Sequence, residues 1–248
     1  MSKQTFQGEA EKPMNLRFLE RPRVDCILEK ALQSYMVTVV AGEGNGKTHA
    51  VNSFLRKRKR NVTWIQLSEQ DNLGWHLWEN YLGEVARVGP GTAKLFSDIG
   101  FPESDRQLDQ YLGLLKDKTR GLDPYVTVFD DFHLITNPEV LLHLDRALAA
   151  LVSNNPFIFI SRREPAIRTV NFLSKGILSE ITVDDLRFTR EETEGYFRLN
   201  QVFLKEEELS RIFEKTEGWA LVLGLILLEI KAGEAGGHSW DRVMRPIR

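Results

Sequence analysis

The feature that most constrains the fold is a strand pattern, a glycine-rich loop and a helix pattern in immediate succession between Met36 and Arg60. The run "MVTVV" is apolar and β-branched, which predicts a buried strand. It leads into "AGEGNGKT", which matches the pattern G-x-x-x-x-G-K-[ST] except that Ala41 stands in place of the first glycine. The helix pattern begins at this loop, so its N-terminal partial charge adds to the attraction for an anion. This order predicts a loop that binds the phosphates of a nucleotide. A chance glycine-rich turn, the alternative, does not account for the strand and helix on either side.

Each residue type in the loop suits phosphate binding. The glycines allow positive φ, so that successive backbone N–H groups can turn toward phosphate oxygens. Lys47 is expected to reach the β- and γ-phosphates, and Thr48 to offer its hydroxyl to Mg²⁺. The residues expected to bind the nucleotide here are Gly42, Glu43, Gly44, Asn45, Gly46, Lys47, Thr48 and His49.

Two later strand patterns end in charged residues, "VTVFDD" at Asp130 and Asp131 and "FIFISR" at Arg162. Ligands of parallel sheets gather at the carboxyl ends of the strands. We therefore expect Asp130 to hold Mg²⁺ through its water shell, Asp131 to orient the attacking water, and Arg162 to sense the γ-phosphate. The expected catalytic residues are Lys47, Asp131 and Arg162. The alternatives are a solvated loop or a helix cap for the aspartates and a surface position for Arg162. His133, in "DDFHLI", is expected to pack or cap, with contact to the active-site water as the alternative.

Strand and helix patterns alternate through most of the chain. Strands are expected near residues 36–41, 61–68, 125–131, 156–163 and 177–183, and further helices near 24–33, 73–88, 105–118 and 138–153. Alternation of this kind indicates a parallel sheet with helices on both faces. The expected fold class is the α/β, three-layer P-loop NTPase fold. A strand near 61–68, between the loop strand and the aspartate strand in sequence, is typical of its additional-strand branch.

The pattern changes after Leu186 to three helices without strands, near residues 189–201, 205–216 and 219–233. Thr189 and Glu192 form a predicted capping box. We expect a flexible tail at 1–15, a P-loop ATPase domain at 16–184, a helical lid domain at 185–233, and the start of a truncated further domain or a tail at 234–248. Four tryptophans in apolar patterns are expected in the core: Trp64, Trp75, Trp78 and Trp219.

Composition excludes some functions. The net charge is −2 and the pI about 6.3, so the chain as a whole has no charge excess for binding nucleic acid or an anionic membrane. The basic run Arg56–Arg60 is better explained as a solvated helix end, with a nucleic-acid or partner contact as the alternative. Cys26 is the single cysteine, and the apolar run from Trp219 has about a dozen residues against the ~20 of a membrane span. We expect a cytoplasmic protein without a membrane segment.

Several motifs, in order, resemble the STAND class of signal-transducing ATPases, and within it the MalT-type regulators of the LuxR family. The similar segments are "FLERPRV", "WIQLSEQDNLGWHLWENYL", "FDDFHLI", "ISRREP", "DLRFTREE" and "TEGWALVLGLIL". They extend from about Phe18 to Leu228. Ala220 stands where many members of the class have proline.

The resemblance implies further site residues and a regulatory activity. Leu19 and Arg21 would receive the adenine and phosphate ends of ATP or ADP, and Gly218 and Trp219 would close over the nucleotide. The chain would be the core of a transcription regulator, closed with ADP and open to self-association with ATP, under an inducer that the sequence does not identify. Hydrolysis would be slow, and DNA would be bound only through a C-terminal domain absent from this chain. Two alternatives stay open: a DNA-associated ATPase of AAA+ type, such as an initiator or loader, and a module that holds ADP without turnover.

Overall fold

The computed structural model describes residues 16–88, 90–119, 125–151, 156–167, 172 and 176–234. This part of the chain divides into two compact units. Residues 21–187 form a sheet unit, and residues 16–20 join 188–234 in a helical unit. The assignment of these units as ATPase and lid domains stays a prediction.

The sheet unit contains five parallel strands in the order β2-β3-β4-β1-β5. Their bounds are β1 Met36–Val40, β2 Asn61–Gln66, β3 Tyr125–Asp130, β4 Phe157–Ser161 and β5 Leu178–Ile181. The predicted strands and the parallel three-layer architecture are confirmed. In space, β4 is the strand that separates the loop strand β1 from the aspartate strand β3, while β2 lies on the outer side of β3.

Strand side chains divide between two cores according to the two-residue period of a strand. Phe129, Phe157 and Phe159 belong to one core, where the rings of Phe129 and Phe159 stack with centroids 5.4 Å apart. Ile158 and Ile160, from the same strand β4, belong to the core on the opposite face. Both faces of the central strands are therefore buried, which explains their nearly continuous apolar sequence.

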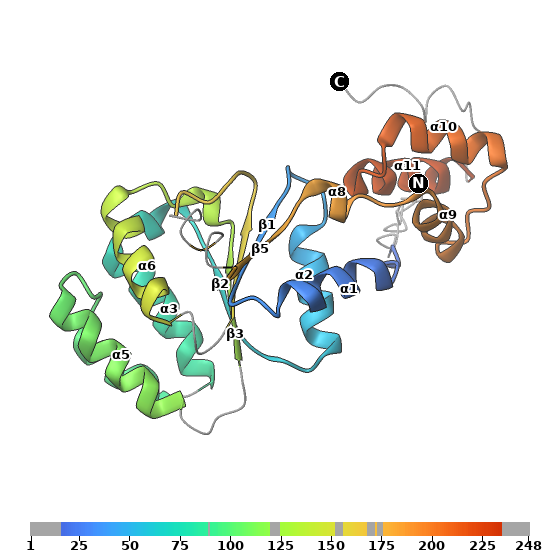
Figure 1. Cartoon of the computed structure of the whole chain (residues 1–248). Coiled ribbons are helices and arrows are strands. Elements are labelled where there is room, and N and C mark those ends of the chain that lie inside the picture. Colours follow the sequence, from blue (N-terminus) through green and yellow to red (C-terminus); the bar gives the residue numbers. More distant parts are fainter. Residues whose placement is uncertain are drawn as a thin grey trace, which may run out of the picture. The chain divides into compact units, whose positions relative to one another are not determined.

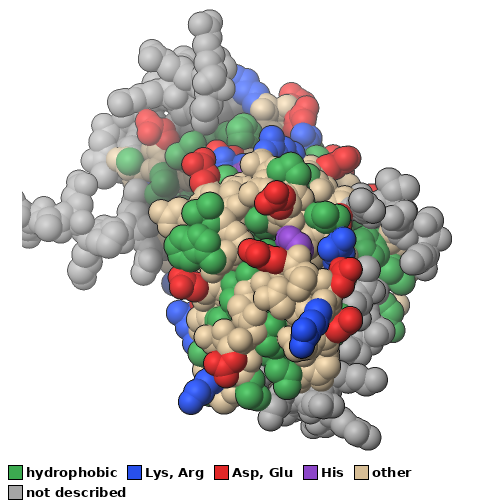
Figure 2. All heavy atoms as spheres, turned by 90° about the vertical axis from the view of Figure 1, so that its left-hand side faces the viewer, with side chains coloured by type: hydrophobic (Ala, Val, Ile, Leu, Met, Phe, Trp, Pro, Cys, Tyr) green, Lys and Arg blue, Asp and Glu red, His purple; other side chains and the backbone are tan. Residues whose placement is uncertain are grey.

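Helices cover both faces of the sheet (Figure 1). On one side lie α1 (Pro22–Ala31) and α2 (Lys47–Lys57). On the other lie α3 (Gly74–Val88), α4 (Pro90–Ile99), α5 (Asp105–Thr119) and α6 (Pro138–Leu151). Short turns follow β2 and β3, namely η1 (Glu69–Asn72) and η2 (Phe132–Leu134), and α8 (Val183–Leu186) follows β5. Acidic and basic side chains are interspersed with hydrophobic ones on the face that α3, α5 and α6 present (Figure 2).

Two expectations about the helices were incomplete or wrong. Helix α4 was not predicted, and its Phe96 is fully buried in the aromatic core. Trp75 was expected in the core but is 57% exposed. Leu77 and Trp78 lie on the apolar face of α3 that packs against the core, whereas Trp75 lies outside that face.

The helical unit is built from α9 (Arg190–Leu199), α10 (Glu206–Thr216) and α11 (Ala220–Glu234) around its own apolar core. The predicted capping box is present, because the Thr189 hydroxyl accepts from Glu192 N at 3.1 Å and Glu192 Oε2 accepts from Thr189 N at 3.0 Å. Trp219, also expected in the core, is 39% exposed just before α11. Within the described residues, every helix is too short or too polar to cross a membrane.

Candidate functional site

The glycine-rich loop connects β1 to α2 at the carboxyl edge of the sheet. Gly44 and Gly46 have φ of 71° and 76°, which places them in the left-handed region, and α2 begins directly after Gly46. Gly42 was also expected to use positive φ, but it does not, and a Cβ at this position would lie 3.5 Å from Asn45 Nδ2, an ordinary contact. The backbone freedom of glycine is therefore required at two of the three positions.

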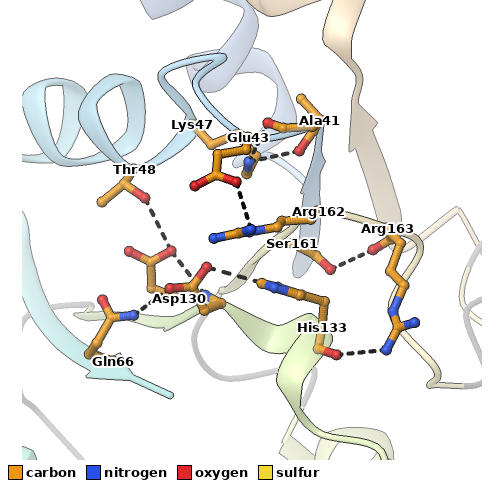
Figure 3. Close-up of polar contacts among 12 residues, drawn as sticks. Ala41, Glu43, Lys47, Thr48, Gln66, Asp130, His133, Ser161, Arg162 and Arg163 are labelled. Atoms are coloured by element: carbon orange, nitrogen blue, oxygen red, sulfur yellow. Dashed lines mark hydrogen bonds and ion pairs between the residues drawn. The ribbon is translucent and has the colours of Figure 1, made fainter. Parts of the chain in front are cut away.

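Side chains of the loop bind its own carbonyl groups. Lys47 Nζ donates to Ala41 O at 2.7 Å and to Gly42 O at 2.9 Å, so the ammonium lies across the start of the loop (Figure 3). Asn45 Nδ2 donates to Gly42 O at 3.1 Å. Burial lowers the pKa of Lys47, and the positive charge of Arg162 lowers it further. An anion held by this loop would favour the charged ammonium.

Thr48 and Asp130 bring two oxygen atoms together from different elements. Thr48 Oγ1, in the first turn of α2, donates to Asp130 Oδ1 at the end of β3 at 3.2 Å (Figure 3). Asp130 is buried, and this desolvation raises the pKa of its carboxyl group. Mg²⁺ prefers hard oxygen donors, and a nearby cation would reverse the electrostatic penalty on Asp130. The two residues therefore fit the expected metal.

Asp131 lies where the chain leaves β3 and turns into η2. Its φ of 58° is in the left-handed region, which is uncommon for residues other than glycine. Its Oδ2 accepts a hydrogen bond from Gln66 Nε2 at 2.8 Å, and its Oδ1 lies 3.8 Å from His133 Nδ1. The two aspartates are thus differently placed, with Asp130 buried beside Thr48 and Asp131 between Gln66 and His133.

Arg162 lies directly after β4, between the loop and the aspartates. Its guanidinium forms an ion pair with Glu43 of the glycine-rich loop, with Nη1 and Oε2 2.9 Å apart (Figure 3). The next residue, Arg163, donates from Nη2 to His133 O at 3.1 Å. The end of β4 therefore contacts both the phosphate-binding loop and the segment after Asp131.

The remaining predicted residues fall in two places. Arg21 donates from Nη2 to Arg187 O at 2.7 Å and is near enough to His49 for its charge to lower the pKa of His49, after the larger effect of burial. Leu19, Gly218 and Trp219 belong to the helical unit, where Leu19 packs against the apolar core. Their expected contacts with a nucleotide stay predictions.

Sequence reasoning missed Gln66 and Asn72. Gln66 is the last residue of β2 and pairs in register with Asp130, so a polar residue at the carboxyl end of a strand was the available signal. Asn72 connects η1 to the segment after β3. Its Nδ2 donates to Leu134 O at 2.8 Å, and its Oδ1 accepts from Thr136 N at 2.7 Å and Asn137 N at 2.8 Å.

The basic run Arg56–Arg60 lies at the end of α2 and contacts α1. Lys57 pairs with Asp25 at 3.0 Å, and Arg58 pairs with Glu29 at 2.6 Å. Two of the five cations thus have acidic partners within the sheet unit, which favours the structural explanation of this run.

No family model matches the chain. A Walker-type ATPase of Pyrococcus abyssi has a similar structure, with a TM-score of 0.60 and 16% identity over 94% of this chain and 74% of that chain. The ORC1 protein of Aeropyrum pernix, solved in complex with DNA, matches with a TM-score of 0.50 and 13% identity over 92% of this chain and 64% of its own. Together with the strand order and the loop geometry, these similarities identify the P-loop NTPase fold.

Proposed function

We propose that the chain binds ATP with Mg²⁺ and hydrolyses it slowly to ADP and phosphate. The observation that carries the proposal is the meeting of Thr48 and Asp130, 3.2 Å apart, beside the glycine-rich loop of a P-loop fold. Lys47, the first residue of α2, adds a buried ammonium. A phosphate-binding loop, a cation and a pair of metal-binding oxygens are the parts that phosphoryl transfer requires.

Each residue has a separate task in this reaction. Lys47 would neutralise charge on the β- and γ-phosphates. Thr48 and Asp130 would hold Mg²⁺, which when bound neutralises phosphate oxygens. Asp131 would orient a water molecule for in-line attack on the γ-phosphorus, whose bond to the bridging oxygen breaks. Arg162 would exchange its ion pair with Glu43 for the γ-phosphate.

The proposed biological use is a switch in a transcription regulator of the STAND class, supported by the order of the motifs. ADP would hold the chain closed, and ATP would open it for self-association when an inducer binds. Converting a 1:99 ratio of states to 99:1 requires roughly 5.5 kcal/mol of preferential binding. Contacts of Arg162 with the γ-phosphate would supply only part of this free energy. The proposed switch therefore also requires an inducer, whose binding would supply the rest.

The proposal is tested first by nucleotide binding. Calorimetry with ADP and ATP should give clear binding to the wild type and none to Lys47→Ala, with both proteins folded by circular dichroism. Equal affinity in the two proteins would refute the assignment of the loop.

Hydrolysis is tested next by single-turnover cleavage of ATP. The wild type should cleave slowly, and Asp131→Asn should be at least roughly 100-fold slower because the water is no longer oriented by a carboxylate. The likeness to ORC1, which was solved with DNA, supports a second candidate, a DNA-associated ATPase. Stimulation by added duplex DNA would favour that candidate, and absence of cleavage in both proteins would favour a module that only holds ADP.

A further inference from the structure

The carboxylate of Asp131 lies between two nitrogen atoms from different segments of the sheet unit. Gln66 Nε2, at the end of β2, donates to Oδ2 at 2.8 Å. His133 Nδ1, in η2, is 3.8 Å from Oδ1. Each carboxylate oxygen therefore has its own neighbouring nitrogen, and Figure 3 shows Gln66 and His133 approaching the site from two elements.

His133 is packed in a way that leaves this nitrogen without a hydrogen bond. The Nδ1 atom is buried and has no hydrogen-bond partner in the described part of the chain. Buried polar atoms are nearly always satisfied in folded proteins, so such an exception calls for an explanation. Oδ1 of Asp131 is an acceptor only roughly 0.8 Å beyond the usual hydrogen-bond distance of about 3.0 Å. Burial lowers the pKa of His133, which favours the neutral ring, and the tautomer with its proton on Nδ1 would direct an N–H at Oδ1.

Several contacts fix the backbone of the two flanking residues. Arg163 donates to His133 O, and the ring of Phe132 packs edge-on against Phe159 with centroids 5.0 Å apart. Asn80 Nδ2 donates to Gln66 O at 3.0 Å. These contacts fix Gln66 and His133 without using the side chain of Asp131, whose backbone carbonyl accepts from Leu134 N of η2 at 3.0 Å.

Asn72 links the segment after Gln66, the last residue of β2, to the segment after β3, which carries His133. It belongs to η1, which follows β2, and its side chain binds the backbone of residue 134, the last of η2, and of residues 136 and 137, which follow η2. A shift of η2 away from β2 would break these hydrogen bonds. The spacing between Gln66 and His133 is therefore controlled by the fold, and Asp131, in the left-handed region, lies in the space between them.

We propose that Gln66 and His133 are positioning residues for Asp131: Gln66 holds Oδ2 through a hydrogen bond, and His133 Nδ1 faces Oδ1 from 3.8 Å, so that the carboxylate keeps the direction needed to orient the attacking water. This inference rests on the proposed hydrolysis. It assigns neither residue to nucleotide binding, since both act through Asp131. Their loss should slow cleavage and leave affinity unchanged.

The test measures single-turnover cleavage of Mg²⁺-ATP and calorimetric ADP affinity on the full chain. Gln66→Leu and His133→Leu should each slow cleavage roughly 10- to 100-fold, the usual effect of displacing a catalytic group by about 1 Å. ADP affinity should stay within about twofold of the wild type. Gln70→Leu is the matched control, because Gln70 is exposed in η1 and the same substitution there should change neither quantity.

Two further variants separate positioning from packing at His133. Asparagine places its side-chain nitrogen near the position of Nδ1, whereas glutamine places it near Nε2. His133→Asn should therefore recover most of the rate, and His133→Gln should not. In an Asp131→Asn background, Gln66→Leu and His133→Leu should change the residual rate by less than about twofold, because residues that act through one group are not additive.

The outcomes distinguish this inference from the proposed function. A wild type that cleaves ATP, together with unchanged rates in Gln66→Leu and His133→Leu, overturns the positioning role alone. Equal rates in His133→Asn and His133→Gln overturn it for His133. A wild type that binds ATP without cleaving it overturns both proposals together.

Discussion

At the scale of single residues, the backbone conformation and close packing of Gly218 require glycine there, whether or not a ligand is bound. Its φ is 76°, and a Cβ at this position would lie 2.1 Å from Phe188 O, within the helical unit. Phe188 N also donates to Gly218 O at 2.9 Å, and this hydrogen bond keeps the two backbone segments close together. Gly224, inside α11, is different, because a Cβ there would meet Tyr196 Oη at an ordinary 3.7 Å.

Gly218→Ala should therefore destabilise the helical unit by about 2 kcal/mol or more, through the clash and the strained φ. Gly224→Ala should stabilise it by roughly 0.5–1 kcal/mol, because alanine is favoured over glycine in a helix. Urea unfolding followed by circular dichroism measures both. Similar stability for the two variants would contradict this expectation and would mean that the backbone at Phe188 moves to accommodate the Cβ at little cost in free energy.

Asp130 gives the second residue-scale prediction, which concerns pH. Burial raises the pKa of Asp130, so the native state binds this proton more tightly than the unfolded state. The contribution of the group to stability is present at low pH and is lost as pH rises from the unfolded value of about 3.9 through the higher native value. Asp130→Asn cannot ionise, and its Oδ1 can still accept from Thr48.

The thermal midpoint of Asp130→Asn, measured without Mg²⁺, should exceed that of the wild type by a margin that grows between about pH 4.5 and pH 7.5. Addition of Mg²⁺ and ADP should raise the midpoint of the wild type more than that of the variant. Asp109→Asn, at an exposed position of α5, serves as the control and should show neither effect. A margin that shrinks with rising pH would contradict the raised pKa.

At the scale of secondary structure, the strands were predictable because strands buried on both faces produce continuous apolar runs. The glycine loop and Asp130 were predictable for a related reason, since each follows such a run directly. Helix α4, which was not predicted, begins with Pro90 and Gly91; both residues are unfavourable in a helix interior, although proline is acceptable in the first turn.

The pairing of Gln66 with Asp131 could not be predicted in the same way. It depends on β2 lying beside β3, with Gln66 opposite Asp130 in register. Sequence order places β2 immediately after α2 and leaves its neighbour in the sheet undetermined. The position of His133 Nδ1 depends in addition on the left-handed turn at Asp131, for which aspartate is only one of several permitted residues.

The capping box at Thr189 supplies the prediction at this scale. Thr189→Ala removes the oxygen that accepts from Glu192 N, leaving one donor of the first turn of α9 without its partner. The cost should be about 1 kcal/mol in urea unfolding, and Thr189→Ser should recover most of it. An alanine variant as stable as the wild type would mean that water replaces the cap without cost.

At the scale of the whole molecule, the expected nucleotide contacts are distributed over both units. The phosphate-binding residues belong to the sheet unit, whereas Leu19, Gly218 and Trp219, expected near the base, belong to the helical unit. A switch between ADP and ATP states requires the nucleotide to interact with both units, because a ligand shifts an equilibrium only through different affinities for the two states. A nucleotide that contacted the sheet unit alone would not change the conformational equilibrium of the helical unit.

Trp219 decides between these two cases. Its side chain is 39% exposed, and Phe203, in the same unit, is a 78% exposed aromatic residue to compare with it. If the helical unit closes on the nucleotide, Trp219→Ala should weaken ADP binding roughly tenfold or more, the usual contribution of stacking between a base and an aromatic ring, while Phe203→Ala leaves it unchanged. Calorimetry gives the affinities, and thermal unfolding verifies that both variants stay folded. If both variants bind ADP as the wild type does, the helical unit takes no part in nucleotide binding, and the proposed switch loses the contact through which ADP would hold it closed.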